Sequence, residues 1–183
     1  SGKSAYAEAQ AGASGLAVHV IATATAGDAE MAARIAAHRA RRPTDWITHE
    51  AEMALAQALT RTAAPDHCVL VDCLGLWVSN LLHAGEAVFA AERAALLDRL
   101  PALPGRVLLV SNEVGLGIVP MGALSRRFVD EAGRLHQALA ALLALGAAGR
   151  AGGLRAARHP LLSAPWRGRS RGASRGPASS HPH

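Results

Sequence analysis

Three short apolar runs along the chain predict buried parallel strands. They cover residues 16–22 (LAVHVIA), 68–72 (CVLVD) and 106–111 (RVLLVS). Unbroken β-branched and aliphatic runs are typical of strands covered on both faces, whereas half-exposed strands alternate. Between the runs, amphipathic segments favour helices over residues 4–10, 28–41, 48–61, 85–100 and 125–145. This alternation predicts an α/β fold with a mostly parallel sheet flanked by helices.

The composition changes abruptly near residue 146. Residues 1–146 hold 12 Lys/Arg and 14 Asp/Glu, whereas residues 147–183 hold seven Arg and no acidic residue. The net charge of +5 therefore comes from the tail. We expect a folded domain over 1–146 and an Arg/Gly/Ser/Pro-rich, disordered tail over 147–183. Such a tail can hold RNA through its charge, although no base-reading motif accompanies it.

No segment predicts a membrane protein. The longest apolar run, residues 138–148, is shorter than the roughly 20 residues that a spanning helix needs. The chain also shows no secretory signal, so we expect a cytoplasmic protein.

The first four residues match the second half of a phosphate-binding P-loop, G-x-x-x-x-G-K-[ST]. Gly2 lets the backbone approach a phosphate, Lys3 supplies a positive charge, and the hydroxyl of Ser4 can bind Mg²⁺. Together with Ser1 these residues form only SGKS, a string that also occurs by chance in flexible termini.

An aspartate ends the second predicted strand. Four apolar residues followed by Asp72 resemble a Walker B strand, whose carboxylate would lie beside Ser4 and reach Mg²⁺. The alternative is an aspartate that caps the next helix.

The second predicted helix carries a histidine among arginines. His38 shares a stripe with Ile35, which by itself is typical of a core histidine. Arg39, Arg41 and Arg42 surround it at the end of the helix, and such a cluster suits a polyphosphate. Neighbouring cations favour the neutral imidazole, which is the form that can attack phosphorus.

Two polar segments follow predicted strands, at the edge where open α/β sheets bind ligands. Thr23-Ala24-Thr25 follows the first strand, and residues 112–120 (NEVGLGIVP) follow the third. The second segment suits a loop that folds over a ligand, and equally a plain structural loop.

With these segments in order, the chain resembles the bifunctional adenosylcobinamide kinase/adenosylcobinamide-phosphate guanylyltransferases of cobalamin biosynthesis. The resemblance covers residues 1 to about 145, and the long blocks make it specific. It rests on the blocks SGKS, IAT, EMAARIAAHRARRPTDW, VLVDC, WVSNLL, VSNEVGLGIVP and RRFVDEAGRLHQ.

The resemblance implies a P-loop NTPase-like fold and a role for each matching residue. His38 corresponds to the nucleophile that takes GMP from GTP as a phosphohistidine, and Lys3 and Asp72 assist catalysis. Ser4 and Asp72 would bind Mg²⁺, and the family commonly forms homotrimers. The implied nucleotide contacts are Ser1, Gly2, Lys3, Ser4, Thr23, Ala24, Thr25, Arg39, Ala40, Arg41, Arg42, Glu50 and Asp72.

The implied activity has two halves. The kinase would phosphorylate adenosylcobinamide with ATP or GTP, and the guanylyltransferase would convert adenosylcobinamide phosphate to adenosylcobinamide-GDP. The competing hypothesis is a P-loop protein that binds nucleotide without catalysis. Binding alone would not require a histidine among arginines.

Both ends depart from the family pattern. The family has a strand and a full glycine-rich loop before SGKS, and an apolar strand after the long helix. We expect this sheet to lack both strands, and nucleotide binding to be weaker for it. The composition beyond Gly146 resembles the product of a reading-frame shift in a GC-rich gene, so a degenerate, inactive member of the family is a further alternative.

Overall fold

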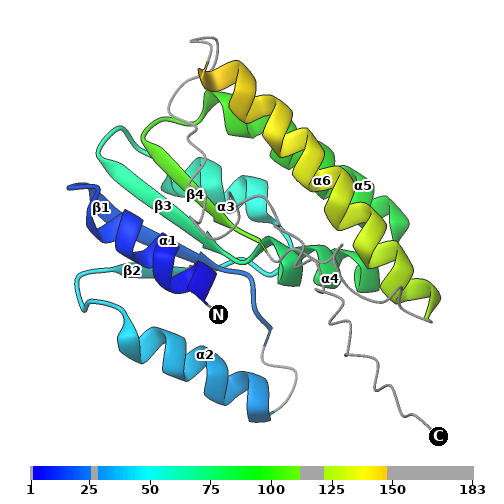
Figure 1. Ribbon diagram of the computed structural model, residues 1–183, viewed down its shortest axis with the longest axis horizontal. Coiled ribbons are helices and arrows are strands. Elements are labelled where there is room, and N and C mark those ends of the chain that lie inside the picture. The colour runs from blue at the N-terminus through cyan, green and yellow to red at the C-terminus, as the bar shows by residue number, and fades with distance from the viewer. Residues whose placement is uncertain (1, 26–28, 112–121, 148–183) are drawn as a thin grey trace, which may run out of the picture.

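The protein forms a four-stranded sheet in which every strand pair is parallel (Figure 1). The computed structural model describes residues 2–25, 29–111 and 122–147. The strand order is β2-β1-β3-β4. The bounds are β1 Ala17–Ala22, β2 Ile47–Glu50, β3 His67–Asp72 and β4 Arg106–Val110. The expected parallel α/β fold is therefore confirmed.

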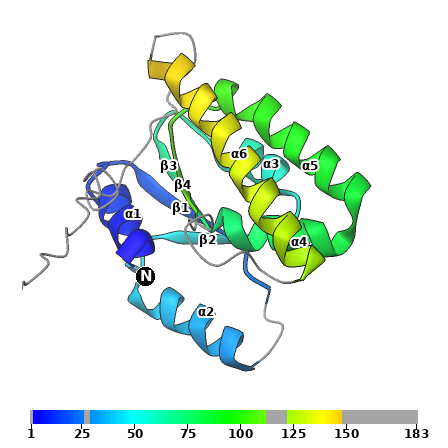
Figure 2. The same cartoon turned by 45° about the vertical axis from the view of Figure 1, so that its right-hand side comes forward.

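Helices cover both faces of the sheet. One face contacts α1, and the other contacts α3, against which α5 and then α6 pack (Figures 1 and 2). In both views α2 lies apart from these layers, beyond the end of α1. The helices are α1 Gly2–Gly12, α2 Ala29–Arg41, α3 Leu55–Thr62, α4 Leu74–Ala84, α5 Glu86–Arg99 and α6 Ala123–Ala147, with a 3-10 turn at Leu100–Ala102.

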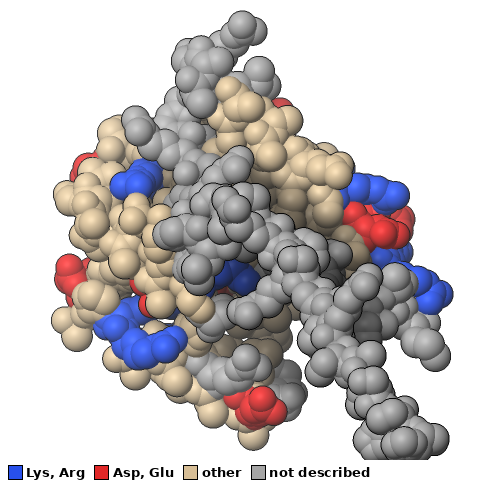
Figure 3. Space-filling view, in the orientation of Figure 1, with Lys and Arg blue, Asp and Glu red and all other residues tan. Residues whose placement is uncertain are grey.

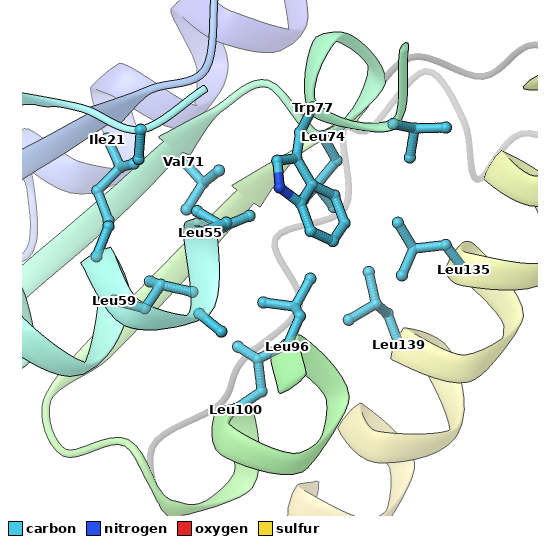
Figure 4. Packing of buried hydrophobic residues seen from close by; sticks show 14 of the residues in the cluster. Ile21, Leu55, Leu59, Val71, Leu74, Trp77, Leu96, Leu100, Leu135 and Leu139 are labelled. Carbon is cyan, nitrogen blue, oxygen red and sulfur yellow. The ribbon is translucent and has the colours of Figure 1, made fainter. Parts of the chain in front are cut away.

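The strands β1, β3 and β4 contribute residues to two separate cores. In β3, Cys68 and Leu70 face α1, while Val69 and Val71 face the other helices. This two-sided burial is the reason that the strand has an unbroken apolar sequence. The larger core centres on Trp77, which is fully buried among leucines from α3, α5 and α6 (Figure 4).

The prediction of a helix over 48–61 is wrong at its start. Residues 47–50 form β2, which pairs with β1 so that Ile47 lies opposite His19 and Glu50 opposite Ala22. The helix α3 begins only at Leu55, so Thr48 does not cap it. These four residues are extended because they pair with β1, a contact distant in sequence that overrides the local pattern.

The sheet is continuous over the described ranges. β3 pairs directly with β4, from Cys68 opposite Arg106 to Asp72 opposite Val110. No helix in the described ranges has both the length and the apolar character to cross a membrane. Residues 148–183 lie outside the described part of the chain, so the prediction of a disordered tail stays a prediction.

Candidate functional site

The carboxyl ends of the parallel strands, the first turn of α1 and the end of α2 meet at one edge of the molecule. Ser4 comes from α1, Asp72 ends β3, and His38 lies in the last turn of α2. Basic side chains (blue) gather over this end of α2 in Figure 3. These three residues are more than thirty positions apart in the sequence, and the fold brings them together.

Asp72 is the centre of the site. Its Oδ1 accepts a hydrogen bond from the hydroxyl of Ser4 at 3.2 Å, and its Oδ2 accepts one from Nη2 of Arg42 at 3.1 Å. The Nδ1 atom of His38 lies 3.8 Å from the same Oδ2. Only 13% of the Asp72 side chain is exposed, so these contacts act in partly desolvated surroundings.

Glu8 joins the site, although it belongs to no recognisable motif. Its Oε1 lies 3.5 Å from Nε of Arg42. Ligand atoms of Glu8, His38 and Asp72 lie within 4.8 Å of one another, close enough to hold a metal ion. One signal was available: Glu8 follows Ser4 by four residues, so a helix places both on one face.

The imidazole of His38 is accessible rather than sealed in a core. About a third of its side chain is exposed, and Nη2 of Arg41 lies 3.3 Å from Nδ1. A guanidinium only donates, so Nδ1 is the acceptor here and a neutral ring carries its proton on Nε2. The expectation of a core histidine, which the stripe alone would give, is not met.

Thr23 holds the ends of β1 and β3 together. Its buried hydroxyl donates to the carbonyl of Cys73 at 2.7 Å and accepts from the amide of Cys73 at 3.0 Å. Its own amide donates to the carbonyl of Asp72 at 3.3 Å. These bonds fix the backbone directly after the Asp72 side chain.

Cys73 borders the site without being suited to act as its nucleophile. Burial raises the pKa of its thiol, and the Asp72 carboxylate adds to this, while Lys3 opposes it. A thiol with a raised pKa carries less thiolate, the reactive form, near neutral pH.

The other predicted residues have other partners or positions, or lie outside the described residues. Arg39 pairs with Glu50 of β2, and both side chains are largely exposed. Gly2 begins α1, Ala24 and Thr25 follow β1, and Ala40 is exposed on α2. Ser1 and the predicted loop 112–120 lie outside the described residues.

Comparisons with known proteins agree on one family. The family model described as "Cobinamide kinase / cobinamide phosphate guanyltransferase" matches residues 1–151. The bifunctional adenosylcobalamin biosynthesis protein CobP of Pseudomonas aeruginosa is 60% identical over 141 residues, 76% of this chain and 82% of that protein. The CobU proteins of Salmonella typhimurium and Escherichia coli are 43% and 41% identical over 155 residues, 77% of this chain and 85% of each.

Proposed function

The chain belongs to the cobinamide kinase/cobinamide phosphate guanyltransferase family, and from this premise we propose that the Ser4–Asp72–His38 site carries out both reactions. It phosphorylates adenosylcobinamide with ATP or GTP. It then transfers GMP from GTP to adenosylcobinamide phosphate through a guanylyl-histidine, which yields adenosylcobinamide-GDP.

The kinase half uses the start of α1. The free N–H groups of the first turn and the ammonium of Lys3 bind the β- and γ-phosphates. The hydroxyl of Ser4 and the carboxylate of Asp72, 3.2 Å apart, are hard oxygen donors that fit Mg²⁺. Bound there, Mg²⁺ supplies charge that stabilises the transferring phosphoryl group.

The guanylyl half uses the imidazole of His38. A ring nitrogen attacks the α-phosphorus of GTP, a P–N bond forms, and the bond to the bridging oxygen breaks to release pyrophosphate. A phosphate oxygen of adenosylcobinamide phosphate then attacks the same phosphorus and releases the histidine. Attack by Nε2 requires the other tautomer from the one that the Arg41 contact favours, with the ring proton on Nδ1, where the Asp72 oxygen at 3.8 Å can accept a hydrogen bond from it after a small shift.

The remaining nucleotide contacts and the oligomeric state are proposed from the family resemblance. Nucleotide contacts extend over Ser1–Ser4, Thr23–Thr25, Arg39–Arg41 and Glu50. The active assembly is a homotrimer, which sedimentation at several protein concentrations would test.

One observation carries the proposal: the His38 ring shares the Asp72 carboxylate with Ser4 of the phosphate-binding segment. Mere nucleotide binding requires no accessible imidazole at that position, so this geometry favours the transferase over a non-catalytic P-loop protein.

Labelling with GTP tests the proposal. The protein incubated with α-phosphate-labelled GTP should form an acid-labile, base-stable adduct, and His38→Ala should abolish it while leaving the kinase reaction measurable. His83→Ala is the matched control, because His83 is an exposed histidine that bonds within α4. Undiminished labelling of His38→Ala would remove His38 from this role.

A further inference from the structure

The helix that carries His38 is held by charge rather than by apolar packing. None of its described side chains, at 29–33 and 35–41, is buried. None of them belongs to either core cluster or packs against one. Something other than apolar burial must therefore fix the position of α2.

Arg42, directly after α2, is the buried contact. Only 6% of its side chain is exposed, against 47% for Arg39 three residues earlier. Its guanidinium reaches Glu8 on α1 at 3.5 Å and Asp72 at the end of β3 at 3.1 Å. Charge-assisted bonds in partly desolvated surroundings are stronger than exposed ion pairs. Arg42 thereby joins α2 to two elements of the main body.

The same contacts determine where His38 lies. His38 precedes Arg42 by four residues, one helical turn, and both approach Oδ2 of Asp72. With both carboxylates already engaged, the guanidinium is not free to bind a phosphate without giving up a contact.

We infer that Arg42 is a positioning residue, which sets the distance between His38 and the bound nucleotide by bonding Glu8 and Asp72, and does not itself bind phosphate. This inference rests on the proposed function for its catalytic consequence. Its structural consequence, the attachment of α2, stands independently. It replaces the expectation that Arg42 contacts the nucleotide directly.

The test compares Arg42→Met with Arg99→Met. Methionine keeps most of the side-chain length but removes both bonds, whereas Arg99 is an exposed residue at the end of α5. We expect Arg42→Met to slow single-turnover labelling of His38 by GTP about 100-fold, the effect of a misplacement of about 1 Å. The dissociation constant for GTP should stay unchanged. Arg99→Met should change neither quantity.

A second measurement does not depend on activity. Amide hydrogen exchange over 29–41, without nucleotide, should be faster in Arg42→Met and unchanged in Arg99→Met, because α2 opens locally when its attachment is lost. If the unaltered protein is not labelled by GTP, the proposed function fails, and this exchange measurement still decides the role of Arg42.

Arg42→Lys covers the case in which Arg42→Met does not fold. Lysine keeps the charge but lacks the planar fork that reaches two carboxylates. The rates of hydrogen exchange over 29–41 and of GTP labelling should therefore lie between those of the unaltered protein and those of Arg42→Met. Equal losses of GTP affinity and labelling rate in these variants would indicate a direct phosphate contact and overturn the inference. Unchanged exchange over 29–41 in both variants would do the same.

Discussion

The helix that carries His38, α2, differs from the helices of the large core in how it is held. On the core side, α3, α5 and α6 bury leucines around Trp77. On the other side of the site, α2 buries no described side chain and is attached through Arg39, Arg42 and their carboxylate partners. Apolar packing tolerates little displacement, whereas a helix held by a few ion pairs has fewer contacts to break before it opens locally. The difference teaches that His38, the proposed nucleophile, lies on a helix that charged contacts rather than buried apolar side chains hold in place.

Removing the centre of the core should have the largest effect on this contrast. Trp77→Ala should lower the free energy of unfolding by about 3–5 kcal/mol, because it leaves a cavity. It also removes the indole that donates to the carbonyl of Met53 at 2.6 Å, although that carbonyl still accepts from the amide of Leu55 at 2.8 Å. Urea denaturation gives the value.

Ile35→Ala on α2 is the matched truncation. Ile35 is only half-buried and belongs to neither cluster, so we expect a loss under about 1 kcal/mol. A loss as large as that of Trp77→Ala would show that α2 is packed like the core, and the contrast would be lost.

Acid should weaken the sheet through His19. Burial lowers the pKa of His19 below its ordinary 6.5, and the nearby His67 and His49 lower it further, while Asp66 raises it. The unfolded chain therefore binds this proton more readily, so the free energy of unfolding falls as pH drops below about 6.5 and is unaffected above it. Denaturation at about pH 7.5 and about pH 5.5 measures the change.

His19→Gln should flatten this pH dependence, whereas His83→Gln, at an exposed position, should not. An undiminished slope in His19→Gln would assign the effect to other groups. The ring of His19 stacks on His67 with centroids 4.1 Å apart, so some destabilisation at every pH is expected.

We expect the smallest loss of stability when the exposed ion pair between Arg39 of α2 and Glu50 of β2 is removed. Arg39→Met should change the free energy of unfolding by less than about 1 kcal/mol, because its pair with Glu50 is solvated. The measurement is again urea denaturation, repeated in high salt, where the difference from the unaltered protein should shrink further. A loss of several kcal/mol would show that Arg39 shares the anchoring role of Arg42.

The buried strands were predictable because each one shows its burial locally. The run from Cys68 to Asp72 is apolar at every position but the last, and the structure covers both faces of it. β2 was missed because ITHE contains a single large apolar residue, and that residue, Ile47, is half exposed. Its extended conformation comes from pairing with β1, which no local pattern encodes.

The site divides in the same way. Ser4, Asp72 and His38 stand in segments that have motifs, and the fold brings them together. Glu8 has no motif, and its contact with Arg42 spans 34 positions of the chain. The burial of Arg42 was likewise invisible, because an arginine in a run of arginines is as a rule solvated.

The crossed bonds between Thr23 and Cys73 have a mechanical consequence. The hydroxyl of Thr23 bonds both the amide and the carbonyl of Cys73. It therefore extends the pairing of β1 and β3 beyond the last residues of the two strands. A displacement of the turn after β1 would therefore also move Asp72 at the end of β3. The two segments proposed to contact the nucleotide would move together.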